Sequence, residues 1–278
     1  MGIVPIDVDF KVYKTIEEIQ NDTDKVKQTG DAWFTNVYVG SDLFSRFISK
    51  GVVKGLPSDK TSSIIVELQD MTKLYFFTVD FKDFAESVEK FLSGLKLPLV
   101  TEIYTDPRNS AQVDDLQKYL MELGFKHHAT QFRLTRFSKN NFYGEIEPQW
   151  YAEENDCEEI YQMLRDTFDI RCDQIPDVDE LRERASNREI LKINADGKIA
   201  SAIIFHRKPS VAEWVFWLTR PEYRTDFYGI NLREMYLQLT GNVRRQIMYV
   251  REKKMQKFHE RFGFNADGFE NRIFVLTK

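Results

Sequence analysis

The spacing of apolar positions along the chain changes repeatedly between two and about 3.6 residues, which predicts alternating strands and helices. In the first half, a β-prone run precedes apolar positions at helical spacing, and a strand, a helix and another strand follow. These five elements are expected at residues 75–79, 84–95, 99–104, 114–123 and 131–136.

The second half predicts a longer series, which begins with two helices and a hairpin. The hairpin turns at Asp196-Gly197, a pair that favours a tight two-residue turn. A strand, a helix, a strand, a helix and a last strand follow it. Apart from the helix that begins after residue 224, these elements are expected at 160–168, 181–185, 190–193, 199–205, 212–219, 246–250, 253–261 and 272–276.

The two halves end alike. Leu123-Gly124-Phe125 and Phe262-Gly263-Phe264 each follow a helix and precede a strand, and the two glycines are 139 positions apart. A glycine after the last periodic residue ends a helix because it accepts the left-handed conformation, and the next Phe can then fold back on the core. The repeat predicts a tandem duplication with domains at 1–140 and 146–278 and a linker near residues 138–147.

Composition narrows the class of protein. The chain has 278 residues, 42% of them hydrophobic, and a net charge of −5, which argues against a DNA-binding protein that relies on a broad basic field. Neither the two cysteines nor the pair His127-His128 has ligand spacing, so we expect no metal site. No apolar window is long enough for a membrane span, and the acidic, mixed start is unlike a signal peptide. We therefore expect a cytoplasmic protein without a membrane partner.

Residues 213–268 contain a strand, a turn, a helix, a second strand and a second helix. This order, which opens with Ala212-Glu213 and closes with Phe262-Gly263-Phe264, resembles the second half of a GNAT-superfamily N-acetyltransferase. The resemblance covers residues 148–278 well and residues 1–137 only partly. It implies an α/β protein of two tandem GNAT-like units, each with a mixed, mostly antiparallel sheet flanked by helices, of which the N-terminal unit is degenerate.

The same resemblance implies an acyl-CoA site between the fourth strand of the unit and the next helix. There the superfamily carries Arg/Gln-x-x-Gly-x-Gly/Ala, whose backbone N–H groups bind the pyrophosphate at the helix start. Arg224 and Gly229 fit this motif, but Phe227 replaces its first glycine and Asp226 adds a negative charge. A shifted alignment uses Gly229-Ile230-Asn231, and an ordinary loop without a cofactor is the alternative. The candidate cofactor-binding residues are Leu218, Thr219, Arg224, Thr225, Tyr228, Gly229, Ile230, Asn231 and Leu232.

Two residues are candidates for catalysis. Glu213 matches the glutamate that acts as general base in the histone-acetyltransferase branch, and burial among aromatic residues is expected to raise its pKa. His259 stands where the family often has a tyrosine that acts as general acid. The alternatives are a solvated residue at a strand end for Glu213, and a surface or packing residue for His259. The neighbouring Trp214 and Trp217 are expected to pack against the sheet, with one of the two facing the core.

The resemblance leads to three hypotheses on function. The first is transfer of an acyl group, acetyl in the simplest case, from acyl-CoA to an amine of a small molecule or peptide, by direct attack in a ternary complex. The second is a Fem-like transferase that takes aminoacyl-tRNA, for which a degenerate pyrophosphate loop is tolerable. The third is a GNAT scaffold that only binds a small molecule or a protein.

Overall fold

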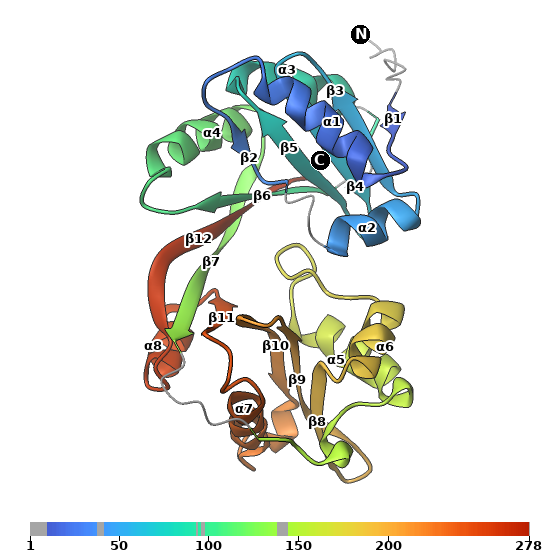
Figure 1. Cartoon of the computed structure of the whole chain (residues 1–278), viewed down its shortest axis with the longest axis vertical. Helices are drawn as coiled ribbons and strands as arrows, with labels where there is room; N and C mark the ends of the chain where they lie inside the picture. Colours follow the sequence, from blue (N-terminus) through green and yellow to red (C-terminus); the bar gives the residue numbers. More distant parts are fainter. Residues whose placement is uncertain (1–9, 38–41, 93, 96–97, 138–143, 278) are drawn as a thin grey trace. The chain divides into compact units, whose positions relative to one another are not determined.

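The computed structural model describes residues 10–37, 42–92, 94–95, 98–137 and 144–277. They form two compact units (Figure 1). Unit 1 consists of Met1–Thr130 and Glu270–Lys278, and unit 2 consists of Gln131–Phe269. Each unit contains a mixed, mostly antiparallel sheet with helices on both faces, as the sequence predicts.

The sheet of unit 1 has the strand order β1-β3-β4-β5-β6-β12, and only β5 and β6 run parallel. Helices α3 and α4 bury one face of this sheet through Phe84 and Leu116, and α1 and α2 bury the other through Ile19 and Phe44. The elements are β1 (Lys11–Val12), α1 (Ile16–Lys27), β2 (Phe34–Thr35), α2 (Asp42–Ser49), β3 (Val53–Pro57), β4 (Thr61–Glu67), β5 (Thr72–Thr78), α3 (Phe81–Leu92), β6 (Leu99–Thr105), α4 (Ser110–Glu122) and the Glu270–Leu276 part of β12.

The sheet of unit 2 has the order β7-β11-β10-β9-β8, and only β10 and β11 run parallel. Helices α7 and α8 cover one face around Trp214 and Phe264, and α5 and α6 cover the other around Phe216. The elements are the part of β7 (Lys126–Phe137) from Gln131 onward, α5 (Cys157–Thr167), α6 (Val178–Ser186), β8 (Ile190–Ala195), β9 (Lys198–Arg207), β10 (Val211–Thr219), α7 (Tyr228–Leu239), β11 (Arg245–Val250), α8 (Lys253–Glu260) and the part of β12 (Asn265–Leu276) up to Phe269, with short 3-10 turns at Pro148–Trp150, Glu154–Asp156 and Pro221–Tyr223.

The last strand of each half of the sequence belongs to the unit of the other half. β7 pairs with β11 of unit 2, and the Glu270–Leu276 part of β12 pairs with β6 of unit 1. The compact units therefore differ from the predicted domains 1–140 and 146–278 at these strands. Of the predicted linker, residues 138–143 lie outside the described residues.

The repeated helix ends have the same geometry. Gly124 and Gly263 have φ angles of +89° and +82°, which is the left-handed conformation. The N–H of Phe125 donates to Leu120 at 3.0 Å, and the N–H of Phe264 donates to His259 at 3.3 Å. Both phenylalanines are buried. The predicted role of Gly-Phe at the two helix ends is confirmed.

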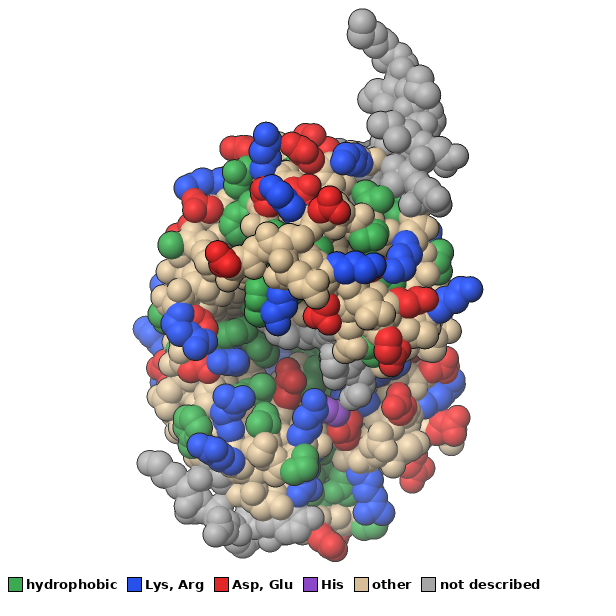
Figure 2. Space-filling model, turned by 45° about the horizontal axis from the view of Figure 1, so that its top comes forward, with side chains coloured by type: hydrophobic (Ala, Val, Ile, Leu, Met, Phe, Trp, Pro, Cys, Tyr) green, Lys and Arg blue, Asp and Glu red, His purple; other side chains and the backbone are tan. Residues whose placement is uncertain are grey.

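None of the helices among the described residues has the length and apolar character that crossing a membrane requires. On the face drawn in Figure 2, Lys and Arg side chains are interspersed with Asp and Glu side chains. This face therefore carries no single broad basic patch.

Candidate functional site

The candidate site is built on β10, which changes partners halfway along its length. Residues 211–214 pair in parallel with β11, and the ladder to β11 ends at Trp214. A bulge in the ladder to β9 follows between Trp214 and Phe216, and β10 continues alongside β9 alone as far as Thr219. Beyond Val215 the edge of β10 that faces β11 has no strand partner among the described residues.

The bulge corrects one expectation from the sequence. Strict alternation predicts that Trp214 and Trp217 point to opposite faces of the sheet, and this prediction is wrong. The extra residue of a bulge reverses the alternation, so both indoles lie on the α7 face, with their ring centroids 5.1 Å apart.

Register identifies the backbone groups that face the open edge of β10. The N–H of Arg220 donates to the carbonyl of Ala200 on β9 at 2.9 Å. Because hydrogen-bonded pairs alternate along an antiparallel ladder, Leu218 also turns its backbone groups toward β9, whereas Trp217 and Thr219 turn theirs away. The backbone groups of Thr219 therefore face the open edge. Those of Leu218 face β9, and its side chain lies in the α5 core.

The open edge leads to the start of α7, which has no cap. No side chain accepts a hydrogen bond from its first turn, and the first helical bond runs from Asn231 to Phe227. Within the described part of the chain, the N–H groups of Thr225 and residues 227–230 have no acceptor. Free N–H groups at the positive end of a helix dipole attract anions.

Phe227 and Gly229 show how this turn is formed. Phe227 has φ +59° in the left-handed region, where glycine is favoured, and its side chain is 66% exposed. A Cβ on Gly229 would lie 2.8 Å from Thr219 Oγ1 and 3.0 Å from the Trp217 indole. Phe227 thus adopts a backbone conformation that normally favours glycine. The missing side chain of Gly229 allows α7 to lie close to β10.

The remaining predicted cofactor residues fall into two groups. Arg224 and Thr225 are exposed, Tyr228 is half-buried, and the Arg224 guanidinium has no partner among the described residues. Asp226 is also exposed, and among the described residues it accepts a hydrogen bond only from its neighbour, Thr225 Oγ1. Leu232 is fully buried in the core, whereas Ile230 and Asn231 lie at its border and on the surface.

Glu213 lies on the opposite face of β10 from the tryptophans, directly opposite His206 of β9. Burial raises the pKa of its carboxyl group, which the positive charges of His206 and Arg184 offset in part. The direction is the one expected from the sequence. The carboxylate has no hydrogen-bond or ion-pair partner among the described residues, which leaves it available to a substrate.

His259 lies on the α7 and α8 face and is 3% exposed. Its ring centroid is 5.7 Å from that of Trp214 and 5.9 Å from that of Trp217. Burial, together with the positive charge of Arg233, lowers the pKa of His259 to about 4. The imidazole is therefore neutral at neutral pH. Glu213 and His259 lie on opposite faces of the sheet, and Glu213 belongs to the part of β10 that still pairs with β11.

Several buried donors near His259 lack partners and were not identified from the sequence. Within the described residues, no hydrogen bond is made by Nδ1 of His259, Nε1 of Trp214 and Trp217, or Nε and Nη1 of Arg233. Buried polar groups are normally paired, so such a cluster calls for an explanation. Nothing in the sequence analysis singled out Arg233. The bulge that brings the two tryptophans together has no sequence pattern of its own.

Unit 1 fills the equivalent edge with its own chain. β5 pairs with β6 only through residues 72–74, and β2 pairs with β5 beyond that point. Asn36 follows β2 and is 2% exposed. Its Oδ1 accepts the N–H of Phe76 at 2.7 Å, and its Nδ2 donates to the carbonyl of Glu102 on β6 at 2.8 Å.

The helix that follows β5 is capped as well. Asp80 Oδ1 accepts the N–H groups of Lys82 at 2.9 Å and of Asp83 at 3.3 Å. A carboxylate of the protein thus occupies the anion-binding end of α3, and Lys60 and the backbone N–H groups lower the pKa of Asp80, which keeps it ionised. Among the residues that the structure describes, unit 2 is therefore the unit whose strand leaves an open edge and whose following helix begins without a cap.

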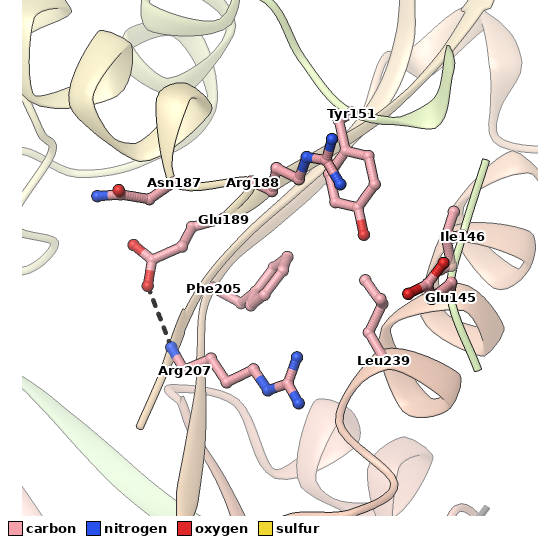
Figure 3. A pocket seen from close by; sticks show the side chains of 9 residues that line it. All are labelled: Glu145, Ile146, Tyr151, Asn187, Arg188, Glu189, Phe205, Arg207 and Leu239. Atoms are coloured by element: carbon pink, nitrogen blue, oxygen red, sulfur yellow. Dashed lines mark hydrogen bonds between the residues drawn. The ribbon is translucent and has the colours of Figure 1, made fainter. Parts of the chain in front are cut away.

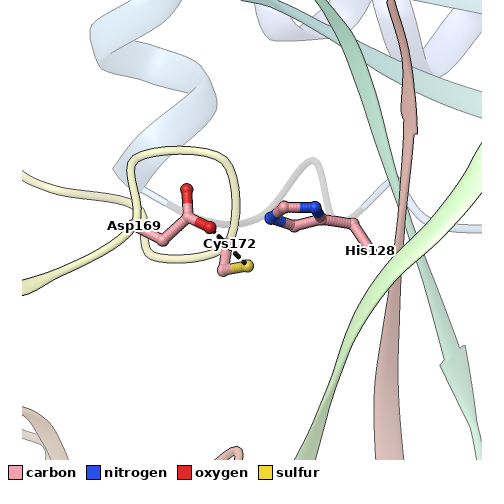
Figure 4. Close-up of side chains that lie close together, drawn as sticks. All are labelled: His128, Asp169 and Cys172. Carbon is pink, nitrogen blue, oxygen red and sulfur yellow. Dashed lines mark hydrogen bonds between the residues drawn. The ribbon is translucent and has the colours of Figure 1, made fainter.

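The two cysteines lie outside this site, and both are buried with free thiols. In Figure 4, Cys172 points toward Asp169, with Sγ 3.7 Å from Oδ2. Burial and the nearby carboxylates raise the pKa of Cys172 to about 12. The thiol therefore stays protonated near neutral pH, and a protonated thiol is a poor nucleophile.

The sequence itself matches no protein-family model and no curated protein, whereas the fold has relatives of known structure. A GCN5-related N-acetyltransferase from Kribbella flavida is 11% identical, with a TM-score of 0.56 over 85% of this chain and 95% of that one. A tandem GNAT protein from the clavulanic acid biosynthesis pathway is 9% identical, with a TM-score of 0.56 over 96% and 97%. A GNAT-family acetyltransferase from Colwellia psychrerythraea is 11% identical, with a TM-score of 0.52 over 98% and 100%. At these identities the similarity establishes the fold: the chain has the tandem GNAT fold.

Proposed function

We propose that the protein is an acyl-CoA-dependent N-acyltransferase, with acetyl-CoA as the simplest donor, and that unit 2 carries the site. The observation that carries this proposal is the open edge of β10 beyond Val215, which leads to the uncapped start of α7. An extended ligand can add to such an edge through main-chain hydrogen bonds. An anionic group at its end can then meet the free N–H groups of the helix.

Different parts of the acyl-CoA donor are proposed to bind at the start of α7 and along the open edge of β10. The N–H groups of residues 227–230 and the unpaired Arg224 suit the CoA phosphates, and the backbone groups of Trp217 and Thr219 suit the amides of the pantetheine arm. The orphan donors of Trp214, Trp217 and Arg233 supply N–H groups for carbonyl oxygens of the donor. Hydrogen bonds at these atoms would satisfy groups that are otherwise costly to bury.

The chemistry requires a base on the acceptor side. Glu213 takes a proton from the ammonium form of the acceptor, and the free amine attacks the thioester carbonyl carbon. The new C–N bond forms, the C–S bond breaks, and the leaving thiolate takes up the proton that the attacking nitrogen loses. His259 is neutral, so its proposed part is to donate an N–H hydrogen bond to the sulfur from the opposite face of β10.

The proposed acceptor is an amine of a small molecule or peptide, and the proposed compartment is the cytoplasm, where the two thiols stay reduced. Neither the acyl chain nor the acceptor follows from the residues at the open edge. A screen that measures release of the CoA thiol from acetyl-CoA, with mixtures of amines and peptides, tests transfer directly.

Glu213→Gln is the informative variant in that assay, because it keeps the size of the side chain and removes the base. We expect turnover to fall at least about a hundredfold with little change in acetyl-CoA affinity. Glu260→Gln is the matched control, since Glu260 is exposed on α8. Equal turnover by Glu213→Gln and the wild type would remove Glu213 from the mechanism, and no thiol release with any acceptor would argue against transfer.

A further inference from the structure

A cavity in unit 2 lies at the C-terminal end of α7, away from the proposed acyl-transfer site at its N-terminal end. It has a volume of about 320 Å³. Figure 3 shows its walls, which come from the segment before α5, the end of α6, β9 and the last turn of α7. The lining residues are Glu145, Ile146, Tyr151, Asn187, Arg188, Glu189, Phe205, Arg207 and Leu239.

This cavity is separate from the proposed acyl-transfer site. Leu239 is the last residue of α7, whose first turn is the proposed phosphate site, and a helix of 12 residues is about 18 Å long. Phe205 and Arg207 flank His206 on β9, so their side chains point to the face opposite His206 and Glu213. A ligand in the cavity would therefore not contact the proposed base.

Arg188, an exposed residue, gives the cavity a positive charge that no described carboxylate pairs. Its guanidinium lies over the ring of Tyr151, 5.5 Å from the centroid, and forms no ion pair or side-chain hydrogen bond with any residue that the structure describes. The residue has φ +56°, an uncommon conformation outside glycine. The second guanidinium at the cavity is that of Arg207, which donates to Asn242 at 3.1 Å.

The acidic residues do not neutralise Arg188. Glu189 accepts the N–H of Arg207 at 3.2 Å, and its carboxylate lies 2.9 Å from His206 Nδ1 and 3.6 Å from Arg184 Nη1. These contacts lower the pKa of Glu189. Its carboxylate is therefore ionised and is already engaged by His206 and Arg184, so it is not free to pair with Arg188. Glu145 is exposed, Phe205 and Leu239 are buried, and most of the exposed lining of the cavity is polar.

We propose that this cavity binds a small organic carboxylate, held by Arg188 and Arg207. A guanidinium binds a carboxylate through two parallel N–H bonds, and the half-buried Tyr151 and Ile146 offer a limited apolar surface to the rest of the ligand. Two carboxylates in the lining disfavour a dianion, so a monoanionic carboxylate fits better than a phosphate monoester. This site is independent of the proposed acyl transfer.

Calorimetric titration of the full chain with phenylacetate tests the proposal. We expect binding at millimolar concentration, weaker binding of phenyl phosphate, and none of phenethylamine, which has a similar body and the opposite charge. Arg188→Gln is expected to weaken phenylacetate binding by about tenfold or more, and Arg188→Lys by less, since it keeps the charge. Arg182→Gln, on the exposed side of α6, is the control and should bind as the wild type does.

Three results would overturn the proposal: no phenylacetate binding to the wild type, equal binding to Arg188→Gln, or equal binding of phenethylamine. Thermal unfolding of each variant, measured without ligand, shows whether a loss of binding comes from a loss of folding. Acetyl-CoA titration of the same variants separates this site from the proposed donor site, because Arg188→Gln should leave acetyl-CoA binding unchanged.

Discussion

Asn36 accepts the backbone N–H of Phe76 at 2.7 Å through its side-chain oxygen, and so fills in unit 1 the edge that unit 2 leaves open beyond Val215. Its amide nitrogen reaches the carbonyl of Glu102 on the neighbouring strand. The amide group thus bridges two diverging strands. The same fold occurs twice in the chain, once with this edge filled by the protein and once with it open.

The bridge predicts a large stability effect for Asn36→Ala. The substitution leaves buried backbone groups of Phe76 and Glu102 without partners, and each costs about 1–3 kcal/mol. We expect the free energy of unfolding to fall by about 3 kcal/mol in urea unfolding monitored by circular dichroism. Asn21→Ala, at an exposed position on α1, is the control. If the free energy of unfolding falls by the same small amount in both variants, the amide of Asn36 does not hold β5 and β6 together.

Phe227→Gly should stabilise the protein. A residue with a Cβ loses about 1–2 kcal/mol in the left-handed region, and the Phe227 side chain is largely exposed, so little packing is lost. Phe227→Ala is the matched control because it removes the ring and keeps the Cβ. We expect Gly to be more stable than Ala by about 1 kcal/mol in chemical denaturation. Equal stability of the two variants would mean that the turn carries no strain at this residue.

Glu213→Gln should change how stability depends on pH. Burial raises the pKa of Glu213 in the folded state above its value in the unfolded chain. The folded state therefore holds this proton more tightly, and the contribution of Glu213 to stability is lost as pH rises through the unfolded and then the folded pKa. Relative to the wild type, Glu213→Gln should gain stability on going from acid to neutral pH.

Melting temperatures of Glu213→Gln and the wild type at pH 4 and pH 7 test this. The exposed Glu222→Gln is the control, and its difference from the wild type should not follow the same trend. A Glu213→Gln difference that is the same at both pH values would show that the carboxylate is not destabilised by burial.

His259 should stay neutral well below the ordinary histidine range. Its pKa is lowered from 6.5 to about 4, so the unfolded chain takes up this proton first as pH falls. Stability is then lost between about pH 6.5 and pH 4. His259→Phe should remove this part of the acid destabilisation, whereas the exposed His127→Gln should not. NMR titration of the ring signals measures the pKa directly, and a value near 6.5 would contradict the burial seen here.

Much of the fold could be predicted from the sequence, because its periodic segments are long. The α/β class and the elements from 157 to 276 follow from apolar spacing, and Gly124 and Gly263 mark the repeat. The exchange of β7 and β12 could not be predicted, since pairing partners leave no local signal. None of the elements before β5 was predicted from the sequence, and β1 and β2, at two residues each, carry no period.

The site was less accessible to sequence reasoning. Gly229 is identifiable because close approach of a helix to a strand requires glycine, and Glu213 because a carboxylate stands beside apolar residues. The bulge at Val215 and the αL conformation of Phe227 are set by packing of β10, β9 and α7, which no short window encodes. The missing cap of α7 becomes apparent only in the structure, where Asp226 accepts no hydrogen bond from the first turn of the helix.

Calorimetric titration of the full chain with acetyl-CoA tests whether the open edge of β10 and the start of α7 bind the acyl donor. We predict that one acetyl-CoA molecule binds per chain, in unit 2. Affinity should fall in Gly229→Ala, whose Cβ would lie 2.8 Å from Thr219 Oγ1, and should be unchanged in Asp80→Asn, which keeps the capping oxygen of α3 in unit 1. No binding at millimolar acetyl-CoA, or binding that Gly229→Ala leaves unchanged, would contradict it.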